Sequence, residues 1–378
     1  MKKALIVAST ASMILQFNID NITLLQELGY TVEVACNFEE GNTCSFDQIE
    51  YLKKTLDRLH IKFHQVEFLR NPFKIQNFGA YRRIKNLLNK ENYSLVHCHS
   101  PIGGVISRIA SRKENIKMVY TAHGFHFYQG ASWKTWWIYY LTEKILSYYT
   151  DVLITLNYED YENAQSFFMK KLMYIPGIGI DTRKYQVSKD VKEEKRKEMT
   201  FHTTDIILCS IGELIARKNH KIILQTLFKL NNKNIHYMII GQGDLKDSLY
   251  NSVKELKLEK QVHFLGYRTD IEELLSISDI YLFPSIQEGL PVALMEAMAA
   301  GLPIIASNIR GNRDLIQNGR NGFLVENKIE EYSLKIVELM ENPLLRKKIS
   351  EQAKKDSVQY DRKRIERMMK KVYESEDL

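Results

Sequence analysis

The chain has 378 residues, more than a single hydrophobic core ordinarily organises, so its length predicts two domains. Hydrophobic residues make up 44% of the sequence and charged residues 26%, a balance that excludes a disordered or collagen-like chain. The net charge of +7 is modest, so it disfavours nucleic-acid binding but allows attraction to an anionic substrate or membrane face. The four cysteines form no CxxC pair, which argues against a disulfide framework or a zinc ribbon and favours a cytoplasmic protein.

The first half of the chain alternates short apolar runs with segments of helical periodicity. The first run, Ala4–Ala8, is too short to cross a bilayer and is interpreted as a buried strand. Helices are expected between the strands, for example over Ile22–Leu28 and Tyr81–Leu88. Continuous apolar strands that are each followed by a helix indicate a parallel sheet covered on both faces. The strands expected in this half are Leu5–Ala8, Thr31–Ala35, His64–Glu67, Leu95–Cys98, Met118–Thr121 and Val152–Thr155.

The alternation weakens beyond Asp181, where the charged stretch Lys189–Glu198 follows, and it restarts at Ile206. We therefore predict an α/β protein of two doubly wound domains, residues 1–178 and 179–378, joined near residues 176–205 and facing a central cleft. The last segment, about residues 361–378, is expected to be a basic amphipathic helix that could pack on either domain, the N-terminal one included. The strands expected in this half are Ile206–Gly212, Tyr237–Ile240, Val262–Leu265, Ile280–Phe283, Ile304–Ala306 and Gly322–Val325.

The most informative segment follows the strand that ends at Phe283 and reads Pro-Ser-Ile-Gln-Glu-Gly-Leu-Pro. A helix is expected to start near Pro291, because proline suits a first helical turn, and its free N–H groups would form an anion site. Gly289 lets a ligand approach the backbone without a Cβ in the way. Glu288 lies before this helix and Glu296 one to two turns inside it, so the two carboxylates could reach two parts of one extended ligand. Since carboxylates accept hydrogen bonds, the pair suits hydroxyl-rich rings such as a hexose and a ribose.

This segment resembles the signature of the retaining family 4 glycosyltransferases, in which seven residues separate two glutamates. The resemblance covers essentially the whole chain, and Tyr120–Tyr128 and Ile175–Asp181 are similar, more narrowly, to exopolysaccharide and capsule transferases of the EpsD type. It implies the GT-B fold, two Rossmann-like domains, with the acceptor on the N-terminal side and the nucleotide-sugar held mainly by the C-terminal one. It also implies that Glu288 contacts hydroxyls of the transferred sugar and that Glu296 binds the ribose; two ordinary surface carboxylates are the alternative. The implied contacts with the sugar and diphosphate fall on Gly289, Leu290 and Pro291.

A second implied site follows the first strand of the C-terminal domain, where Gly212 is expected beside the donor. The family usually shows Gly-Arg-Leu and then a lysine here, and the two basic groups hold the diphosphate. Lys218 matches the lysine, but Glu213 replaces the arginine, so we expect Arg217 or another basic residue to compensate. A departing nucleoside diphosphate gains negative charge, which fixed cations in a dry site stabilise better than water does. A solvated loop side chain is the alternative for Lys218 and for Arg217.

His123 follows the strand Met118–Thr121 and is expected to face the cleft from the N-terminal domain. The resemblance implies that it lies near the donor sugar and acts with Glu288 and Lys218; a packed histidine at a strand end is the alternative. His97 and His99 lie on one face of a neighbouring strand, but only a distant third metal ligand is expected. No Asp-x-Asp pair occurs in the sequence. We therefore expect no metal ion and no cofactor, with a UDP-sugar as substrate.

Two further loops are assigned to the nucleotide by the resemblance. Gly241–Asp244 begins like a dinucleotide fingerprint but lacks the third glycine, so by itself it is a weak signal. Within that loop, Gly243 is expected near the nucleotide. The loop after Val262–Leu265 suits the base, through main-chain bonds and stacking on Tyr267 or Arg268.

All three tryptophans, Trp133, Trp136 and Trp137, fall within five residues. Ordinary core packing is one interpretation of this cluster. The other is a patch at a membrane interface, because Trp favours the headgroup zone and the nearby Lys134 and Lys144 favour anionic lipid. On that interpretation the protein contacts the inner face of the plasma membrane from the cytoplasm.

Together these features predict a retaining, metal-independent glycosyltransferase that moves a hexose or N-acetylhexosamine from a UDP-sugar to a lipid-linked saccharide during surface polysaccharide biosynthesis. Two other functions stay open. One is a sugar-nucleotide epimerase of the same architecture. The other is a catalytically inactive relative that binds a UDP-sugar and serves as an assembly partner, an alternative that Glu213 strengthens.

Overall fold

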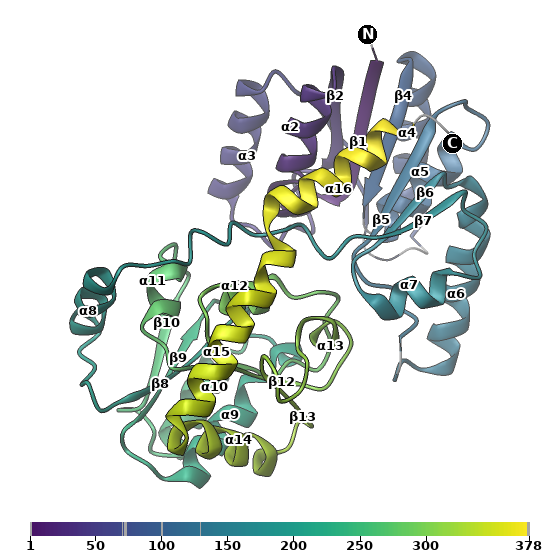
Figure 1. The fold of residues 1–378 in the computed structure, drawn as a ribbon. Helices are drawn as coiled ribbons and strands as arrows, with labels where there is room; N and C mark the ends of the chain where they lie inside the picture. The colour runs from purple at the N-terminus through teal and green to yellow at the C-terminus, as the bar shows by residue number, and fades with distance from the viewer. Residues whose placement is uncertain (1, 70, 72–73, 100, 129, 376–378) are drawn as a thin grey trace. The chain divides into compact units, whose positions relative to one another are not determined.

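The structure is a computed structural model that describes residues 2–69, 71, 74–99, 101–128 and 130–375. The chain divides into two compact units. Unit 1 comprises the residues up to Ile178 together with the segment from Ile365 onward, and unit 2 comprises Gly179–Arg364. The chain therefore passes between the units twice, once after Ile178 and once after Arg364 (Figure 1).

The described part of unit 1 contains one sheet of parallel strands and the helices that connect them. The strands are β1 (Lys2–Thr10), β2 (Tyr30–Asn37), β3 (Lys62–Gln65), β4 (Tyr93–His99), β5 (Lys117–Ala122), β6 (Val152–Thr155) and β7 (Lys171–Tyr174). The helices are α1 (Ala11–Phe17), α2 (Ile19–Glu27), α3 (Phe46–Arg58), α4 (Asn77–Lys90), α5 (Pro101–Ser111), α6 (Trp133–Leu146), η1 (Ser147–Tyr149), α7 (Tyr158–Ala164) and the C-terminal α16 (Arg362–Glu374).

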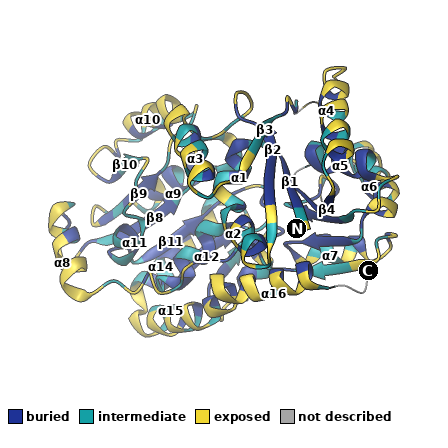
Figure 2. Cartoon of the chain, turned by 90° about the horizontal axis from the view of Figure 1, so that it is seen from above, coloured by how far each residue is buried: buried dark blue, intermediate teal, exposed yellow. Residues whose placement is uncertain are grey.

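The sheet of unit 1 has the strand order β3-β2-β1-β4-β5-β6-β7. The direction of the strand order reverses between β1 and β4. In a parallel sheet, ligands usually bind beyond the carboxyl ends of the strands at such a reversal. Residues Ala4–Ala8 of β1 are fully buried, which explains their uninterrupted apolar run (Figure 2). The edge strand β7 was not expected, because Lys171 is exposed and the other three residues are only half buried.

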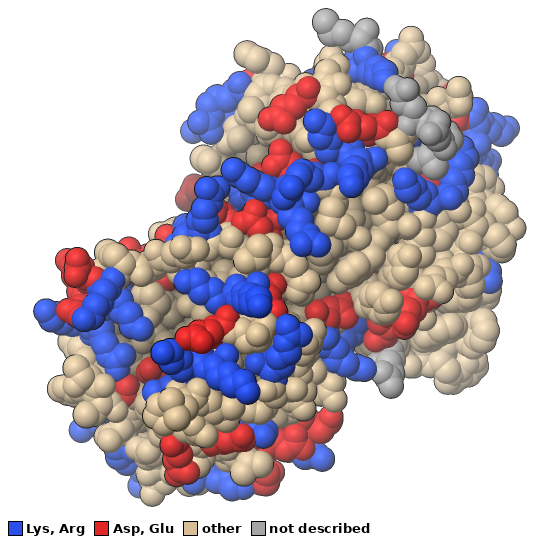
Figure 3. Space-filling view, viewed as in Figure 1, with Lys and Arg blue, Asp and Glu red and all other residues tan. Residues whose placement is uncertain are grey.

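The C-terminal helix α16 belongs to unit 1 from Ile365 onward. Its basic side chains gather along one surface, as Figure 3 shows, while Ile365, Met369 and Val372 are buried. The Tyr373 hydroxyl is hydrogen-bonded to Nδ1 of His97 at 2.8 Å, and Lys117 Nζ donates to the carbonyl of Val372 at 2.8 Å. Of the two domains that this helix could pack on, the structure therefore selects the N-terminal one.

The described part of unit 2 repeats the same architecture. Its strands are β8 (Ile206–Ile211), β9 (Ile235–Ile240), β10 (Val262–Gly266), β11 (Ile280–Phe283), β12 (Ile304–Ser307) and β13 (Phe323–Val325), in the parallel order β10-β9-β8-β11-β12-β13. Its helices are α8 (Lys189–Glu198), η2 (Ala216–Lys218), α9 (His220–Leu230), α10 (Lys246–Glu255), α11 (Ile271–Ser276), α12 (Val292–Ala299), α13 (Asn312–Leu315), α14 (Ile329–Glu341), α15 (Pro343–Ser357) and η3 (Val358–Tyr360).

The charged stretch Lys189–Glu198 falls in the segment near residues 176–205 where the two domains were expected to join. This stretch forms α8 and lies inside unit 2. Lys195 is buried at the centre of an ion-pair cluster, with Nζ 2.7 Å from Asp270, 2.8 Å from Glu198 and 2.9 Å from Glu273. The helix α8 is rich in charged residues because they pair with one another and with neighbours in unit 2. It packs against α11.

Among the described residues, no helix combines the length and the apolar character that crossing a bilayer requires. In each unit, loops after the strand ends carry many of the residues that the sequence analysis singled out, whereas Glu296 lies on α12 and the tryptophans lie on α6.

Candidate active site

The loop after β8 is packed against the loop after β9, and glycines make this contact possible. A Cβ on Gly241 would lie 1.9 Å from the carbonyl oxygen of Gly212, and one on Gly243 would lie 2.6 Å from the carbonyl oxygen of Leu214. Backbone atoms cannot yield to such contacts, so no other residue fits here. Gly243, which was predicted to be near the nucleotide, therefore has a packing role that is independent of any ligand. Gly212 leaves room for Lys218, because a Cβ there would lie 3.2 Å from the lysine side chain.

The segment that follows brings Arg217 and Lys218 to the carboxylate of Glu288. Lys218 Nζ lies 2.8 Å and Arg217 Nη1 2.9 Å from the same oxygen, Oε1. Arg217 Nη1 also donates to the carbonyl of Gln287 at 2.9 Å. The carboxylate and the lysine are largely buried, whereas the Arg217 side chain is 39% exposed. Three residues predicted from separate parts of the sequence therefore meet at one point, with two cations around one carboxylate.

A third cation, Arg310, reaches the same loop and was not predicted. It is 7% exposed, and its Nε donates to the main-chain carbonyl of Glu288 at 3.3 Å. The next residue, Gly311, lies so close that a Cβ on it would be 2.2 Å from the carbonyl oxygen of Gly289. The position of Arg310, three residues after the end of β12, is the sequence signal that could have identified it. Arg310 is a candidate for the compensating basic residue that Glu213 makes necessary.

The helix α12 begins one residue later than expected. Pro291 has φ −79° and ψ 117° and caps the helix, whose first residue is Val292. The carbonyl of Pro291 accepts from the amide of Leu294 at 3.2 Å. One edge of the site consists of the amides of the first turn of α12 and of Gly289 and Leu290. Free amides at the start of a helix favour a bound anion, so an anion is expected at this edge.

Glu296 lies on α12, half buried, and is oriented by a residue that the sequence did not reveal. The Tyr185 hydroxyl donates to Glu296 Oε1 at 2.7 Å. Burial raises the pKa of the Glu296 carboxyl above its usual value, although the Tyr185 hydrogen bond and the charge of Lys184 oppose the change. Burial also raises the pKa of Tyr185, so this hydroxyl keeps its proton and donates a hydrogen bond to the carboxylate. No motif marks Tyr185 in the sequence.

The two side chains predicted to stack on the base lie in different environments. Arg268 is held by Asp270, with Nε 2.7 Å from Oδ1 and Nη2 2.5 Å from Oδ2. Tyr267 is 63% exposed. Because the guanidinium of Arg268 is engaged by a carboxylate, Tyr267 is the better candidate for stacking.

His123 lies in unit 1 at the end of β5, within a cluster of imidazoles. Its Nε2 is 3.1 Å from Nδ1 of His99, and the His99 ring centroid is 4.1 Å from that of His97. Burial lowers the pKa of His123 to about 4, and burial together with the charge of His123 lowers that of His97 to about 3. His123 is therefore neutral at physiological pH and suits hydrogen bonding to a hydroxyl better than charge stabilisation.

The metal interpretation of His97 and His99 finds no support in the geometry. Both ring nitrogens of His97 have partners, since Nδ1 is 2.8 Å from the Tyr373 hydroxyl and Nε2 is 2.8 Å from that of Thr121. Among the described residues, no three or more His, Cys, Asp or Glu side chains are arranged to hold a metal ion.

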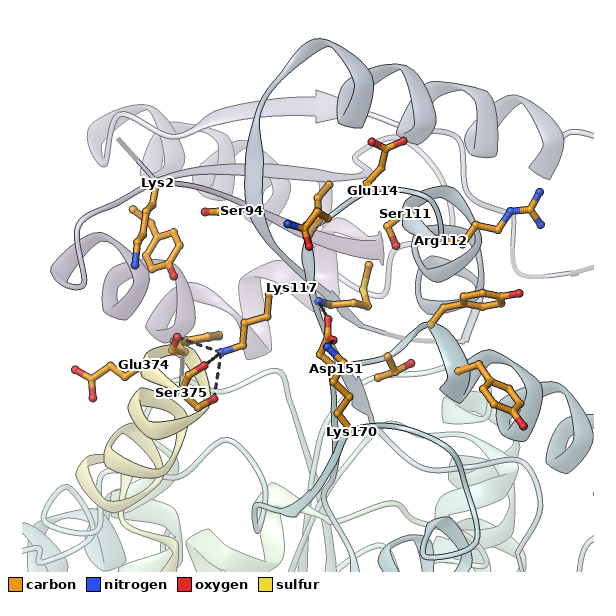
Figure 4. A pocket seen from close by; sticks show the side chains of 18 of the residues that line it. Lys2, Ser94, Ser111, Arg112, Glu114, Lys117, Asp151, Lys170, Glu374 and Ser375 are labelled. Atoms are coloured by element: carbon orange, nitrogen blue, oxygen red, sulfur yellow. Dashed lines mark hydrogen bonds and ion pairs between the residues drawn. The ribbon is translucent and has the colours of Figure 1, made fainter. Parts of the chain in front are cut away.

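A large cavity of about 780 Å³ lies in unit 1, at the opposite end of the sheet from His123. It is lined by residues at the N-terminal ends of the strands, including Lys2, Lys117 and Asp151 (Figure 4). Lys117 is occupied there by the carbonyls of Val372 and Ser375, and Asp151 by the amide of Met118. Lys117 therefore serves the packing of α16 and Asp151 that of β5, and none of the predicted site residues lines the cavity.

Comparisons with known proteins show what the chain is similar to. The family model described as glycosyl transferases group 1 matches residues 191–356, and the model described as glycosyl transferase 4-like matches residues 4–157. EpsD of Bacillus subtilis, named provisionally as a glycosyltransferase, is 32% identical over 98% of this chain and 96% of its own. A UDP-Gal:alpha-D-GlcNAc-diphosphoundecaprenol alpha-1,3-galactosyltransferase of Escherichia coli is 31% identical over 73% of this chain and 74% of its own.

Among solved structures, HepE of Anabaena in complex with UDP is similar with a TM-score of 0.80. The two chains are 19% identical, and the match covers 99% of this chain and 100% of HepE. The likeness shows the fold, two Rossmann-like domains of the GT-B class, which confirms the fold predicted from the sequence.

Proposed function

The chain belongs to the group 1 glycosyltransferases, and on this premise we propose that it transfers a hexose or N-acetylhexosamine from a UDP-sugar to a lipid-linked saccharide. The name of the E. coli relative contains both a UDP-sugar and a diphosphoundecaprenol acceptor, which supports this choice of substrates. We place the reaction in surface polysaccharide biosynthesis, beside a membrane that holds the acceptor.

The observation that carries the proposal is the meeting of Lys218 and Arg217 on Glu288 at the start of α12. In the structure, the Glu288 carboxylate balances the charge of the two cations. With donor, the ammonium and guanidinium groups turn to the diphosphate, and Glu288 is freed to accept hydrogen bonds from the sugar hydroxyls. Glu296, oriented by Tyr185, binds the ribose hydroxyls further along the same helix.

In the reaction that we propose, the acceptor hydroxyl attacks the anomeric carbon from the face that the diphosphate leaves. The bond between that carbon and the diphosphate oxygen breaks, and the leaving diphosphate takes up the acceptor proton. The sugar keeps its anomeric configuration, and the protein supplies no nucleophile. Catalysis then consists of positioning the reactants and stabilising the charge that grows on the diphosphate, with no metal ion.

The two alternatives predict different products from the same donor. An epimerase would convert the UDP-sugar without acceptor, whereas an inactive assembly partner would bind the donor and leave it unchanged. The convergence of cations on Glu288 is compatible with donor binding in both, so product analysis must decide.

The test is NMR of a UDP-sugar with the purified protein, with and without an undecaprenyl-diphosphate-linked saccharide. Release of UDP that requires the acceptor, with an α-linked product from an α-linked donor, supports the proposal. An epimer that forms without acceptor supports the isomerase, and binding alone supports the assembly partner. A thermal-shift screen of UDP-sugars, with GDP-sugars as the control, would identify the donor.

A further inference from the structure

The helix α6 of unit 1 differs from an ordinary surface helix, because it carries large apolar side chains on its inward and on its outward side. Its inward side holds a buried ion pair, in which Arg108 Nη2 lies 2.8 Å from Glu143 Oε2. The Tyr120 hydroxyl donates to the other oxygen of Glu143 at 3.2 Å. Surface helices normally bury their apolar side and expose their polar one. Here the ion pair and the inward packing of Trp136, Tyr139 and Tyr140 fix the helix to unit 1, while further apolar side chains point outward.

The outward surface, which we call the α6 face, consists of large apolar side chains that are about half exposed or more. On a helix with 3.6 residues per turn, those within α6 fall on an arc of roughly 140°. Exposed residues run along the whole of α6 in Figure 2. The α6 face comprises Trp133 (71% exposed), Trp137 (52%), Ile138 (56%), Leu141 (48%), Ile145 (59%) and Tyr148 (63%).

A continuous apolar surface of this kind marks an interaction site, whereas isolated exposed hydrophobic residues do not. The packing beneath it is already complete, because Trp136 stacks on Tyr140 at 4.7 Å and Phe127 contacts both rings. The aromatic cluster thus combines the two interpretations offered by the sequence. Trp136 packs against the core, and Trp133 and Trp137 remain at the surface.

Two lysines lie within the arc of the α6 face, one near each end of the helix. Lys134 Nζ lies 5.7 Å from the ring centroid of Trp133. Lys144 Nζ lies 5.6 Å from the ring of Tyr140 and 5.5 Å from that of Phe168. The acidic residue of α6, Glu143, is buried and already paired with Arg108. The surface therefore offers tryptophan, aliphatic side chains and lysine together.

We propose that the α6 face docks on an anionic lipid bilayer, with its apolar side chains in the interface and its lysines on the headgroups. Tryptophan and tyrosine favour the headgroup region, and lysines gain energy from anionic lipids. A second copy of the chain is a poorer occupant, because a twofold contact through this face would bring the lysines of both copies together. The inference rests on the proposed function, since a lipid-linked acceptor requires the enzyme to work at a membrane.

The chain supplies its own probe for a test. All three tryptophans lie on α6, so their emission reports on this helix alone. The full chain is mixed with vesicles of phosphatidylcholine, or of phosphatidylcholine with phosphatidylglycerol, and membrane binding is measured by flotation and by the shift of tryptophan emission. We expect binding and a blue shift with the phosphatidylglycerol vesicles and weaker binding with phosphatidylcholine alone.

The test variant is Leu141→Ser with Ile145→Ser, which removes apolar surface and keeps every tryptophan. Its matched control is Phe46→Ser with Leu344→Ser, which removes residues that are 76% and 81% exposed elsewhere. We expect partitioning to fall by about tenfold or more in the test variant and to stay near the wild-type value in the control. Charge reversal by Lys134→Glu with Lys144→Glu should remove the preference for phosphatidylglycerol.

UDP binding is titrated on the same samples without vesicles, so that the two proposals can fail separately. Loss of partitioning with intact UDP affinity supports the docking surface. Wild-type protein that does not float, or a test variant that floats like the wild type, overturns it. A wild-type dimer that Leu141→Ser with Ile145→Ser converts to a monomer also overturns it, because a second copy would then cover the face. Absence of UDP binding would count against the proposed function. The vesicle measurements would then still decide whether the α6 face binds a membrane.

Discussion

Replacing Lys218 by methionine tests the cation site most directly, because the change removes the ammonium group and keeps a side chain of similar length. In the structure, the ammonium lies 2.8 Å from Glu288. At an effective dielectric constant of about 20, two unit charges at this separation interact by about 6 kcal/mol. In the proposed reaction, the ammonium exchanges its ion pair with Glu288 for a similar ion pair with the diphosphate, so donor binding changes its interaction energy little. As the bond to the sugar breaks, the diphosphate becomes more negative. The ammonium then stabilises this additional charge, which Glu288 does not carry.

For that reason we expect the Lys218→Met variant to lose turnover more than folding stability. Removing one fixed group that stabilises developing negative charge typically costs about 2.7–4 kcal/mol, or roughly 10²–10³ in rate. Folding should lose only about 1 kcal/mol, because Arg217 still contacts the same Glu288 oxygen at 2.9 Å and the carboxylate is not left unpaired.

The assay is acceptor-dependent UDP release, with UDP affinity measured by calorimetry and stability by urea unfolding. Lys221→Met is the matched control, because Lys221 is an exposed lysine on the neighbouring helix α9. Combining Lys218→Met with Glu288→Gln should not restore turnover. Turnover and UDP affinity at wild-type levels in Lys218→Met would refute the reasoning, as would recovery of turnover in the double variant.

Four other outcomes are expected. Glu288→Gln should lower turnover about tenfold or more, since an amide accepts hydrogen bonds from the sugar hydroxyls less strongly than a carboxylate does, and an unchanged rate would argue against its role. Tyr185→Phe should weaken UDP-sugar binding by about threefold to tenfold, because Glu296 loses the 2.7 Å hydrogen bond that orients it; unaltered affinity in a titration would contradict this. Activity should persist in excess EDTA, and a loss that Mg²⁺ reverses would disprove the metal-free reaction. The free energy of unfolding should fall as the pH drops from about 6.5 toward 4. The reason is that His97 and His123 take up protons at their ordinary pKa of 6.5 only when the chain is unfolded. Each imidazole lowers the free energy of unfolding by up to about 1.4 kcal/mol per pH unit. Urea unfolding at stepped pH measures this fall, and a constant value across the range would rule it out.

The sequence was most informative where a continuous apolar run coincides with a buried strand. The expected strands Val152–Thr155 and Ile280–Phe283 match β6 and β11 residue for residue. The edge strand β7 was missed, because three half-buried residues after an exposed lysine lack such a run. The charged helix α8 was not predicted, because composition does not reveal that Lys195 is paired and buried.

The candidate site shows the same division between local and long-range information. Glu288 and Lys218 were identified by motifs, and the structure places them 2.8 Å apart although 70 residues separate them. Tyr185 and Arg310 were missed, because each reaches the site across the fold from a segment without a motif. Gly243 was assigned to the nucleotide, yet the contact with Leu214 already requires a glycine there.

Because α16 completes unit 1, the order of synthesis matters for this chain. The ribosome produces the seven strands of unit 1 first, and the 186 residues of Gly179–Arg364 then follow before the missing helix emerges. At about 5–20 residues per second, this delay lasts roughly 10 to 40 s. During that time the side of the sheet that receives Tyr373 stays open beside His97. Nascent unit 1 is therefore a natural client for a chaperone, and a fragment that stops at Ile178 should be prone to aggregation.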